Sequence, residues 1–308
     1  MSPSDSEREG AFRESPSATA PVGAFDESET PASSLATTPA GQIVKAGFPV
    51  VESMSEETIR LEQEDGVATI TVDRPDRLNA LNVETLHAFA DALEAAEGAR
   101  VLVVTGAGEK AFIAGADIEY MKELSVAEAH EYARLGHDVC DSIASFPAPV
   151  IAAVNGYAFG GGCEVALAAD LRVASERAVL GQTEIDLGIV PGWGGTQRLS
   201  RLVGDELARR LVFFGERVDA SDAHEYGLVG DVVAHDELDE YVADMAAELA
   251  AKPAFALQAA KEALDQVHEG SLSEGLTFEQ RTWSSLFGTH DQREGMAAFL
   301  EKRDPDFE

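Results

Sequence analysis

Two short runs near residue 60 alternate apolar and polar residues with the period of a β-strand. They are 58–63 (TIRLEQ) and 67–72 (VATITV), and the pair Asp65-Gly66 lies between them. An Asp-Gly pair between alternating runs is typical of a tight hairpin turn. The pattern therefore predicts a β-hairpin at the start of the ordered-looking sequence.

The next apolar residues recur every three or four positions, which is the spacing of one face of a helix. Asn82 precedes this segment as a plausible N-cap and Gly98 follows it as a stop. A longer helix is expected after the capping-box pair Ser125 and Glu128. The apolar face of the first helix consists of Leu86, Phe89, Leu93 and Ala96.

Short apolar runs and helical segments then alternate along the chain. The runs at 101–105, 149–154 and 171–175 have the length and composition of buried strands. Strand and helix in alternation indicate an α/β fold. From about Asp236 the pattern is helical with almost no strand signal, so a smaller helical subdomain is expected there.

Composition sets further limits on the protein. A length of 308 residues with 45% apolar content is enough for a substantial core. The 23 basic and 56 acidic residues give a formal charge of −33, spread along the chain, which argues against nucleic acid as a partner. Six lysines stand against 17 arginines. We interpret this balance as adaptation to concentrated salt, where the Debye length is only about 3 Å; an ordinary acidic protein is the plainer alternative.

Residues 1–53 are rich in Ser, Pro, Ala, Thr and Glu, without periodicity, and are expected to form a disordered acidic tail. Ordered-looking sequence begins at Met54. The alternative interpretation is that the tail is an artefact of start-site choice. Two cysteines, Cys140 and Cys163, are too few for a disulfide framework. No apolar run has the roughly 20 residues of a membrane span. A cytoplasmic protein without membrane contact is expected.

The first segment with chemical interest is 155–164 (NGYAFGGGCE), where a strand becomes a helix. Glycines without Cβ atoms let a ligand approach the backbone, and N–H groups at a helix start favour negative charge. The alternative is a tight turn packed against a neighbour. Glu164 falls in the first helical turn, where the dipole favours its ionised form, and charge compensation alone also explains a carboxylate there.

Two other segments contain glycines. Residues 106–111 (GAGEKA) match a dinucleotide-binding fingerprint, but the following residues read as an irregular loop, so this interpretation is rejected. In 181–199 (GQTEIDLGIVPGWGGTQRL), Glu184 lies between apolar flanks, and glycines from Gly192 onward open another helix. Burial would raise the pKa of Glu184 and make it a general acid. A solvent-facing strand residue is the alternative.

Five motifs in register give this chain its family resemblance. They are RPDRLNALN (74–82), AFIAGADI (111–118), NGYAFGGGCE (155–164), GQTEIDLGIVPGWGGTQRL (181–199) and EGMAAFLEKRDPDF (294–307). Together they resemble the enoyl-CoA hydratase/isomerase family, the crotonases, and most closely its short-chain hydratases. The resemblance implies a crotonase spiral of ββα units at 54–245 and a C-terminal helical trimerisation region at 246–308. It also implies a homotrimer, or a hexamer made of two trimers.

The resemblance also assigns roles around a thioester enolate. The N–H groups of Ala116 and Gly161 would form the oxyanion hole. Glu164 would orient and deprotonate the attacking water, Glu184 would protonate the α-carbon, and the N–H of Gly192 would help to hold the water. A hydratase needs both glutamates, whereas one suffices for a 3,2-isomerase. The two would titrate as a coupled pair.

The acyl-CoA substrate is the expected partner, and because coenzyme A is part of it no separate cofactor is expected. By resemblance, Ala114 and the loop of Ala116, Asp117 and Ile118 line the CoA path together with Gly161, and Lys302 meets a phosphate. No metal site is expected, since His130 and His137 lack a ligand pattern.

The chain departs from the family pattern at two positions. Glu119 stands where many hydratases carry lysine, and Asp76 occupies a loop position that is often basic. Both acids would repel the polyanionic CoA. We therefore expect the affinity for CoA thioesters to rise with salt.

The leading functional hypothesis is reversible hydration of short-chain trans-2-enoyl-CoA, with fatty-acid β-oxidation as its setting, although acyl length and direction stay open. The alternatives are another crotonase reaction, such as 3,2-isomerisation or dehydration of a special 3-hydroxyacyl-CoA, and a non-catalytic acyl-CoA-binding relative. An RNA-binding relative is disfavoured by the charge of −33.

Overall fold

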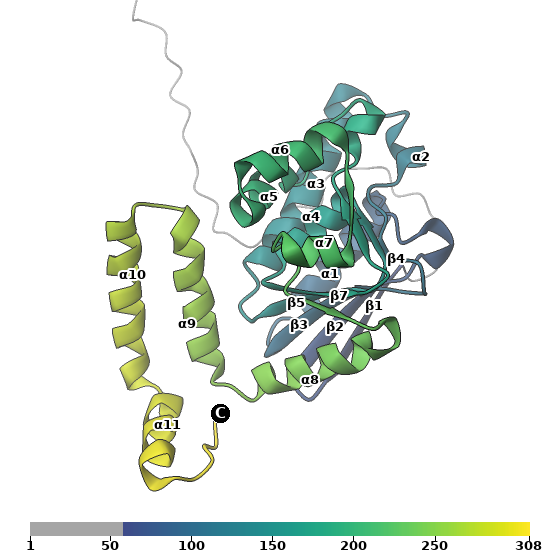
Figure 1. Ribbon diagram of the computed structural model, residues 1–308. Coiled ribbons are helices and arrows are strands. Elements are labelled where there is room, and N and C mark those ends of the chain that lie inside the picture. The colour runs from purple at the N-terminus through teal and green to yellow at the C-terminus, as the bar shows by residue number, and fades with distance from the viewer. Residues whose placement is uncertain (1–57) are drawn as a thin grey trace, which may run out of the picture. The chain divides into compact units, whose positions relative to one another are not determined.

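The computed structural model describes residues 58–308, so the tail expected at 1–53 lies outside the described residues (Figure 1). A six-stranded sheet has the order β1-β2-β3-β5-β7-β10, and a four-stranded sheet has the order β4-β6-β8-β9. The strands are β1 (Ile59–Glu64), β2 (Val67–Val72), β3 (Val101–Gly106), β4 (Ala111–Ile113), β5 (Val150–Val154), β6 (Tyr157–Phe159), β7 (Leu171–Ser175), β8 (Val179–Gly181), β9 (Arg217–Asp219) and β10 (Asp231–Val233). The α/β class predicted from the sequence is confirmed.

Helices connect and cover these strands. The α-helices are α1 (Val83–Ala95), α2 (Ile118–Met121), α3 (Val126–Ala144), α4 (Gly161–Ala168), α5 (Gly195–Val203), α6 (Asp205–Phe214), α7 (Ala220–Glu225), α8 (Leu238–Ala250), α9 (Ala254–Asp265), α10 (Leu272–Ser285) and α11 (His290–Glu301). Short 3-10 turns are η1 (Pro75–Arg77), η2 (Glu184–Leu187), η3 (His235–Glu237), η4 (Gln266–His268) and η5 (Leu286–Gly288).

The large sheet begins with the predicted hairpin and continues as a parallel sheet. Strands β1 and β2 pair antiparallel, and the turn places Asp65 and Gly66 at φ angles of 49° and 82°. Strands β2, β3, β5, β7 and β10 then run parallel. All five residues of β5 are buried, because helices cover both faces of a parallel sheet and leave its central strands without a solvent-facing side.

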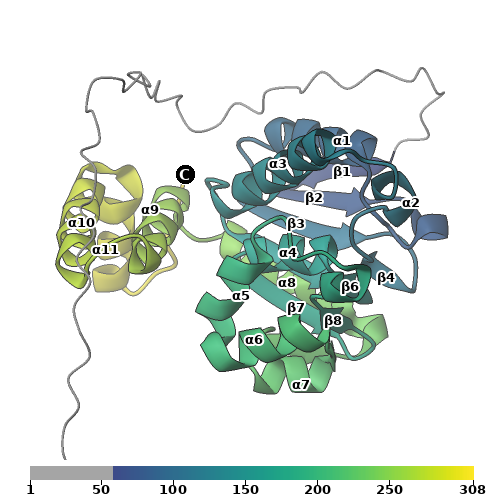
Figure 2. The same cartoon turned by 90° about the horizontal axis from the view of Figure 1, so that it is seen from above.

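The two faces of this sheet have different covers (Figures 1 and 2). Helices α1 and α3 pack with the larger apolar core on one face, and α8 packs on the other face against Val101, Ile151 and Val173. Asn82 caps α1 as predicted by accepting from the Thr85 N–H, and the Ser125–Glu128 capping box opens α3. The boundary expected at 245/246 falls inside α8.

The small sheet leads into the most buried helix. Strand β6 runs parallel to β4 and β8, and after Gly160 the chain enters α4, whose eight residues are all buried. Residues 112–117 were expected in an irregular loop, and this is corrected for Phe112 and Ile113, which lie in strand β4. A three-residue strand has no period to recognise, and pairing with β6, far along the chain, creates it. No helix follows the 106–111 fingerprint, which ends at β4.

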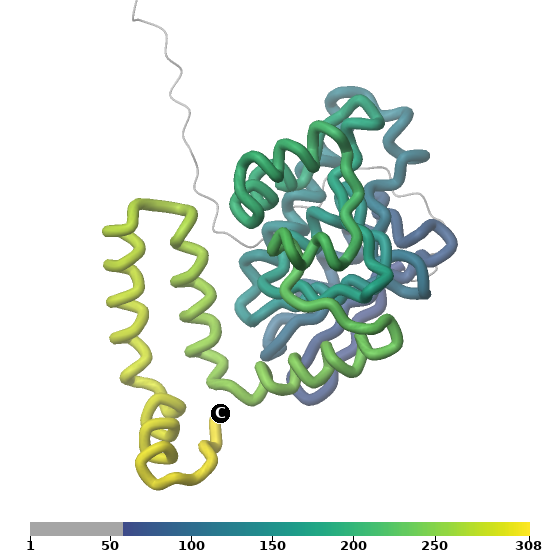
Figure 3. Tube along the Cα trace, viewed as in Figure 1, coloured from purple at the N-terminus to yellow at the C-terminus, as the bar shows by residue number. Residues whose placement is uncertain are grey.

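The C-terminal residues form the predicted helical region, α9 to α11, traced in Figure 3. Lys261 of α9 is buried and pairs with Asp170 at 2.8 Å between Nζ and Oδ2. Arg100 donates to the carbonyls of Ala250, Lys252 and Glu308. These polar contacts join α9 and the chain end to the sheet.

Candidate active site

The Ala116 peptide is oriented by a bridge to Leu81. Leu81 and Ala116 form a parallel bridge, in which the Leu81 N–H donates to Gly115 O and the Asp117 N–H donates to Leu81 O, both at 2.8 Å. In a parallel ladder, the residue flanked by such a pair of bonds directs its own N–H and C=O to the opposite edge. The Ala116 N–H therefore points away from Leu81.

The second amide belongs to Gly161, the first residue of α4. The N–H groups in the first turn of a helix have no intrahelical acceptor. Gly160 turns the chain into this helix with a φ of 49°. A Cβ atom at Gly115 would lie 3.8 Å from the Gly161 nitrogen, so the segments that carry the two predicted oxyanion amides are adjacent.

The glycines of this turn are required by packing as well as by conformation. A Cβ atom on Gly162 would lie 1.8 Å from the Ile113 carbonyl oxygen, and one on Gly161 would lie 2.2 Å from Cζ3 of Trp193. The packed turn, which was weighed as the alternative for this run, is thus present. It coexists with a Gly161 N–H that has no acceptor within the helix.

Glu164 enters the site from the first turn of α4. Its side chain is 2% exposed, and Oε1 accepts hydrogen bonds from the N–H groups of Trp193 and Gly195, each at 2.7 Å. Gly195 is the first residue of α5, entered through Gly194 at a φ of 107°. The start of α5 therefore holds this carboxylate in place.

Burial controls the protonation of Glu164. Desolvation raises its pKa above the ordinary value, against the hydrogen bonds from Gly195, Trp193 and Gly192, which lower it. Burial therefore outweighs the α4 dipole, which was predicted from the sequence to favour the ionised form of Glu164. Gly192, which was predicted to hold a water, has its N–H directed at the same carboxylate.

Glu184 is the first residue of η2 and is 8% exposed, so the solvent-facing strand alternative is wrong. Burial, and after it the charge of Glu164, raises the pKa of Glu184 to about 7. The Gln182 amide lies 3.1 and 3.2 Å from the two Glu184 oxygens and donates to both in its satisfied orientation. A Cβ atom at Gly160 would lie 3.0 Å from Glu184 Oε1. The carboxylate therefore lies over the turn that presents Gly161.

The two carboxylates have a common neighbour. A Cβ atom at Gly195 would lie 2.9 Å from Glu164 Oε1 and 2.7 Å from the side-chain amide of Gln182. Gln182 thus contacts Glu184 and lies close to Glu164. The structure brings together the five predicted residues Ala116, Gly161, Glu164, Glu184 and Gly192, through segments joined by these contacts.

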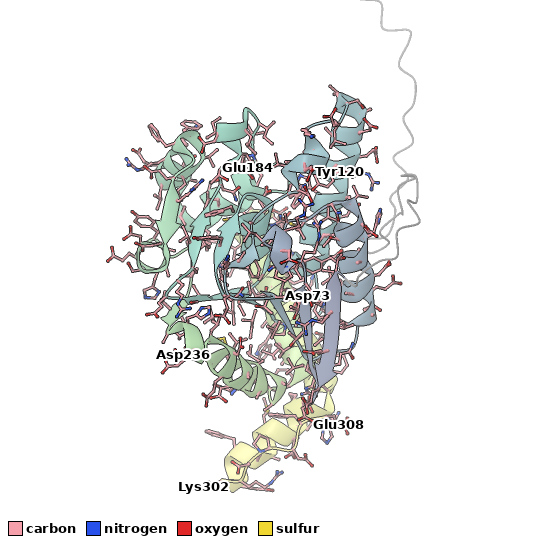
Figure 4. The ribbon with its side chains drawn as sticks, turned by 90° about the vertical axis from the view of Figure 1, so that its right-hand side faces the viewer. Asp73, Tyr120, Glu184, Asp236, Lys302 and Glu308 are labelled. Carbon is pink, nitrogen blue, oxygen red and sulfur yellow. The ribbon has the colours of Figure 1, made fainter. Side chains whose placement is uncertain are left out.

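Four further residues were expected along the CoA path: Ala114, Asp117, Ile118 and Lys302. Ala114 donates to Leu78 O at 3.0 Å, Asp117 caps α2 through the Glu119 and Tyr120 N–H groups, and Ile118 is exposed. Lys302 ends α11 at a φ of 58°. Figure 4 shows it at the opposite end of the view from Glu184 and Tyr120, so one chain does not bring Lys302 to the glutamates.

Sequence reasoning missed three polar side chains that support the site. Gln182 contacts Glu184, and Arg74 pairs with Asp117 at 3.4 Å, which braces the Ala116 loop. The Tyr132 hydroxyl donates to Leu81 O. The position of Gln182, two residues before Glu184, was the one available signal. Nothing in the pattern connects Tyr132 to residue 81.

Other candidate chemistry is not assembled in the part of the chain that the structure describes. Residues 58–308 contain no cluster of His, Cys, Asp and Glu that could hold a metal ion. Cys140 and Cys163 are buried and unpaired, and burial raises the pKa of both thiols. Among the described helices, none has the length and apolar content needed to cross a bilayer.

With this geometry in view, comparison with known proteins gives a consistent answer. The family model for enoyl-CoA hydratase/isomerase matches residues 62–308. The chain belongs to the enoyl-CoA hydratase/isomerase family.

Individual relatives are similar over nearly their whole length. The chain is 42% identical to crotonyl-CoA hydratase from Syntrophomonas wolfei, over 82% of this chain and 99% of that one. It is 42% identical to short-chain-enoyl-CoA hydratase from Clostridium acetobutylicum, over 81% and 97%. Among solved structures, enoyl-CoA hydratase from Bacillus anthracis matches with a TM-score of 0.79 at 37% identity, over 81% of this chain and 98% of that one.

Proposed function

We propose that the protein is an enoyl-CoA hydratase, a hydro-lyase that adds water reversibly to trans-2-enoyl-CoA to give 3-hydroxyacyl-CoA. The observation that carries this proposal is the pair of buried carboxylates, Glu164 and Glu184, next to the adjacent segments of Ala116 and Gly161. Family membership and the hydratase relatives support it.

In this reaction the thioester carbonyl oxygen accepts from the Ala116 and Gly161 N–H groups. Glu164 takes a proton from water, whose oxygen bonds to the β-carbon, and the π electrons move onto the thioester as an enolate. Donors aimed at the developing oxyanion are worth roughly 10²–10³ in rate each. Glu184 then gives its proton to the α-carbon, and transfer of the proton from Glu164 to Glu184 restores the starting state.

The environments of the two glutamates fit a division of roles. Burial raises the pKa of Glu164 on balance, but three backbone N–H groups oppose that rise and favour the ionised form that a base requires. A pKa of about 7 keeps a large fraction of Glu184 protonated near neutrality, as an acid requires. A 3,2-isomerase moves a single proton and has no use for both, which favours hydration over the other crotonase reactions.

Hydration of crotonyl-CoA in high salt, followed as loss of the conjugated thioester absorbance, tests the proposal. The wild type should turn over, and Glu164→Gln and Glu184→Gln should each lose about 10²–10⁴-fold in kcat while still binding the thioester. Turnover of a 3-enoyl-CoA without hydration would instead establish an isomerase. Binding without any turnover would establish a non-catalytic relative. Acyl length needs its own series, since an Escherichia coli relative at 44% identity is a 2,3-dehydroadipyl-CoA hydratase.

The proposal includes assembly into a trimer or a hexamer of two trimers. The described C-terminal helices expose large apolar side chains that a second copy would cover: Phe255, Leu264, Val267, Leu272, Leu276, Trp283, Phe287, Met296, Phe299 and Leu300. An exposed apolar surface of this kind marks an interaction site. In such an assembly, Lys302 serves the CoA phosphate at the site of a neighbouring copy. Light scattering after size exclusion should give three or six chains, and Leu276→Glu should lower that number.

The substrate side of the proposal includes a salt effect. Glu119 is exposed and pairs with Arg77 at 3.0 Å, so its charge is partly compensated in the free protein. Asp76 has no such ion pair among the described residues. Affinity for crotonyl-CoA, measured by calorimetry from 0.1 to 3 M KCl, should increase with salt; a steady decrease would refute this part. The proposed reaction uses no separate cofactor, and the unpaired Cys140 and Cys163 support a cytosolic setting.

A further inference from the structure

Tyr132 of α3 supports the segment that carries the Ala116 amide. Its side chain is 4% exposed, and its hydroxyl donates to the carbonyl oxygen of Leu81. That oxygen also accepts from the Asp117 N–H at 2.8 Å. Because Asp117 follows Ala116 directly, the Tyr132 hydroxyl and the peptide that orients the Ala116 N–H share one acceptor.

Trp193 contacts the other half of the site. Its side chain is also 4% exposed, and it lies against Gly161 so closely that a Cβ there would be 2.2 Å from Cζ3. Gly136 of α3 lies equally close to the ring, since a Cβ atom there would be 2.1 Å from Cε2. The backbone N–H of Trp193 donates to Glu164 Oε1 at 2.7 Å. One residue therefore meets both the second amide and the base.

The two aromatic rings meet each other. The centroids of Tyr132 and Trp193 are 5.6 Å apart with an interplanar angle of 76°, an edge-to-face contact. A continuous line of contacts thus runs from Leu81 through Tyr132 and Trp193 to Gly161. It connects two segments that are 45 residues apart in sequence, from Ala116 to Gly161.

We propose that Tyr132 and Trp193 are positioning residues that fix the spacing of the two oxyanion amides. The inference rests on the proposed function and names side chains that act through the backbone of that site. Sites of this kind need their groups held within about 0.5 Å of the productive geometry. Strands β4 and β6 pair at Ile113 and Ala158, three residues before each amide, and the aromatic pair adds a second, rigid connection beyond the end of that pairing. Its loss lets the Ala116 segment shift relative to α4.

Tyr132→Phe is the principal test, because it keeps the ring and removes only the hydroxyl. Leu81 O retains the Asp117 N–H, so the fold is preserved. We expect kcat for crotonyl-CoA hydration to fall about tenfold with KM within twofold, since the amides act on the transition state. Trp193→Phe, which shortens the contact with Gly161, should lower kcat at least as much.

A second readout follows the amides themselves. The C=O stretch of bound 3-hydroxybutyryl-CoA, labelled with ¹³C at the thioester carbon, moves to lower frequency as hydrogen bonds to the oxygen strengthen. We expect this displacement to be smaller in Tyr132→Phe than in the wild type. Tyr120→Phe is the matched control: Tyr120 packs on Tyr132 with centroids 5.3 Å apart, and no hydrogen bond of its hydroxyl occurs among the described residues.

The outcomes separate the two proposals. A wild type that binds the thioester without hydrating it removes the proposed function, while a reduced displacement in Tyr132→Phe would still support the spacer. An unchanged displacement and kcat in Tyr132→Phe, or equal losses in Tyr120→Phe, overturn the spacer even in an active hydratase. Failure to bind the thioester at all overturns both.

Discussion

Helices α4 and α10 are stabilised by different kinds of interaction. All eight residues of α4 are buried although its first two residues are glycines and it has no side-chain cap. Helix α10 has a full capping box from Ser271 and Glu274, but none of its residues is buried within residues 58–308. Leu272 is 79% exposed and Trp283 61%. Tertiary packing stabilises α4, whereas local signals stabilise α10 and its apolar side chains stay exposed.

The largest effect should come from adding a methyl group to α4. Gly162→Ala places a Cβ 1.8 Å from the backbone oxygen of Ile113, which cannot move without breaking β4. We expect a loss of about 4 kcal/mol or more in the free energy of unfolding, or no folded protein. Urea titration at fixed protein concentration measures it. Near wild-type stability would show that the α4 region adapts more readily than its burial implies.

The second largest loss of stability is expected at the Lys261–Asp170 contact, which joins α9 to the sheet. Lys261→Met retains the apolar stem but leaves the Asp170 carboxylate, among the described residues, with the Val150 N–H alone, a bond of 2.7 Å. The Lys261 side chain is 9% exposed and that of Asp170 27%, so loss of this charged hydrogen bond should cost about 1.5–3 kcal/mol. Lys252→Met is the control, since the Lys252 ammonium pairs with Glu248 on the surface and should cost less than about 1 kcal/mol. Equal losses from both variants would contradict a special role for α9 docking.

The active site should show a stability that depends on pH. The pKa of Glu184 is about 7 in the fold against 4.5 as its ordinary value. Between these two values the folded chain binds more protons than the unfolded chain, so stability falls as pH rises, and the penalty is complete above about pH 7.

Glu184→Gln lacks this titration. The variant should match the wild type at pH 4.5 and exceed it at pH 8 by up to about 3 kcal/mol, by the conversion of about 1.4 kcal/mol per pKa unit. Urea titrations of both proteins at the two pH values measure the difference. A gap that is independent of pH would show that Glu184 is not strained by burial.

The smallest effect is expected from the same type of substitution, glycine to alanine, in α10. Gly275 lies inside α10, and a Cβ there meets no atom within 4 Å in the part of the chain that the structure describes. Gly275→Ala should therefore stabilise α10 by about 0.5–1 kcal/mol, by reducing the entropy of the unfolded chain. The same urea titration checks it. A loss of stability would indicate that a neighbouring copy packs on this face.

The sequence predicted elements with strong local signals. The hairpin turn at Asp65-Gly66, the Asn82 cap and the Ser125–Glu128 capping box were all confirmed. Strand β4 was missed, since only its pairing with β6 defines it. For the site, periodicity gave neither the convergence of Glu164 with Glu184 nor the direction of the Ala116 N–H. The resemblance named these residues, but the Leu81 bridge and the burial that raises both pKa values exist only after folding.

The Leu81–Ala116 bridge has a practical consequence for anyone who maps this protein by mutagenesis. Alanine scanning is blind to one of the two proposed donors, because residue 116 is already alanine, and at Gly161 it reports a collision with an indole ring rather than a missing donor. Replacement of single peptide linkages by esters, through semisynthesis or nonsense suppression with hydroxy acids, removes the hydrogen and leaves every side chain in place. That chemistry, rather than side-chain substitution, is suited to weighing each donor.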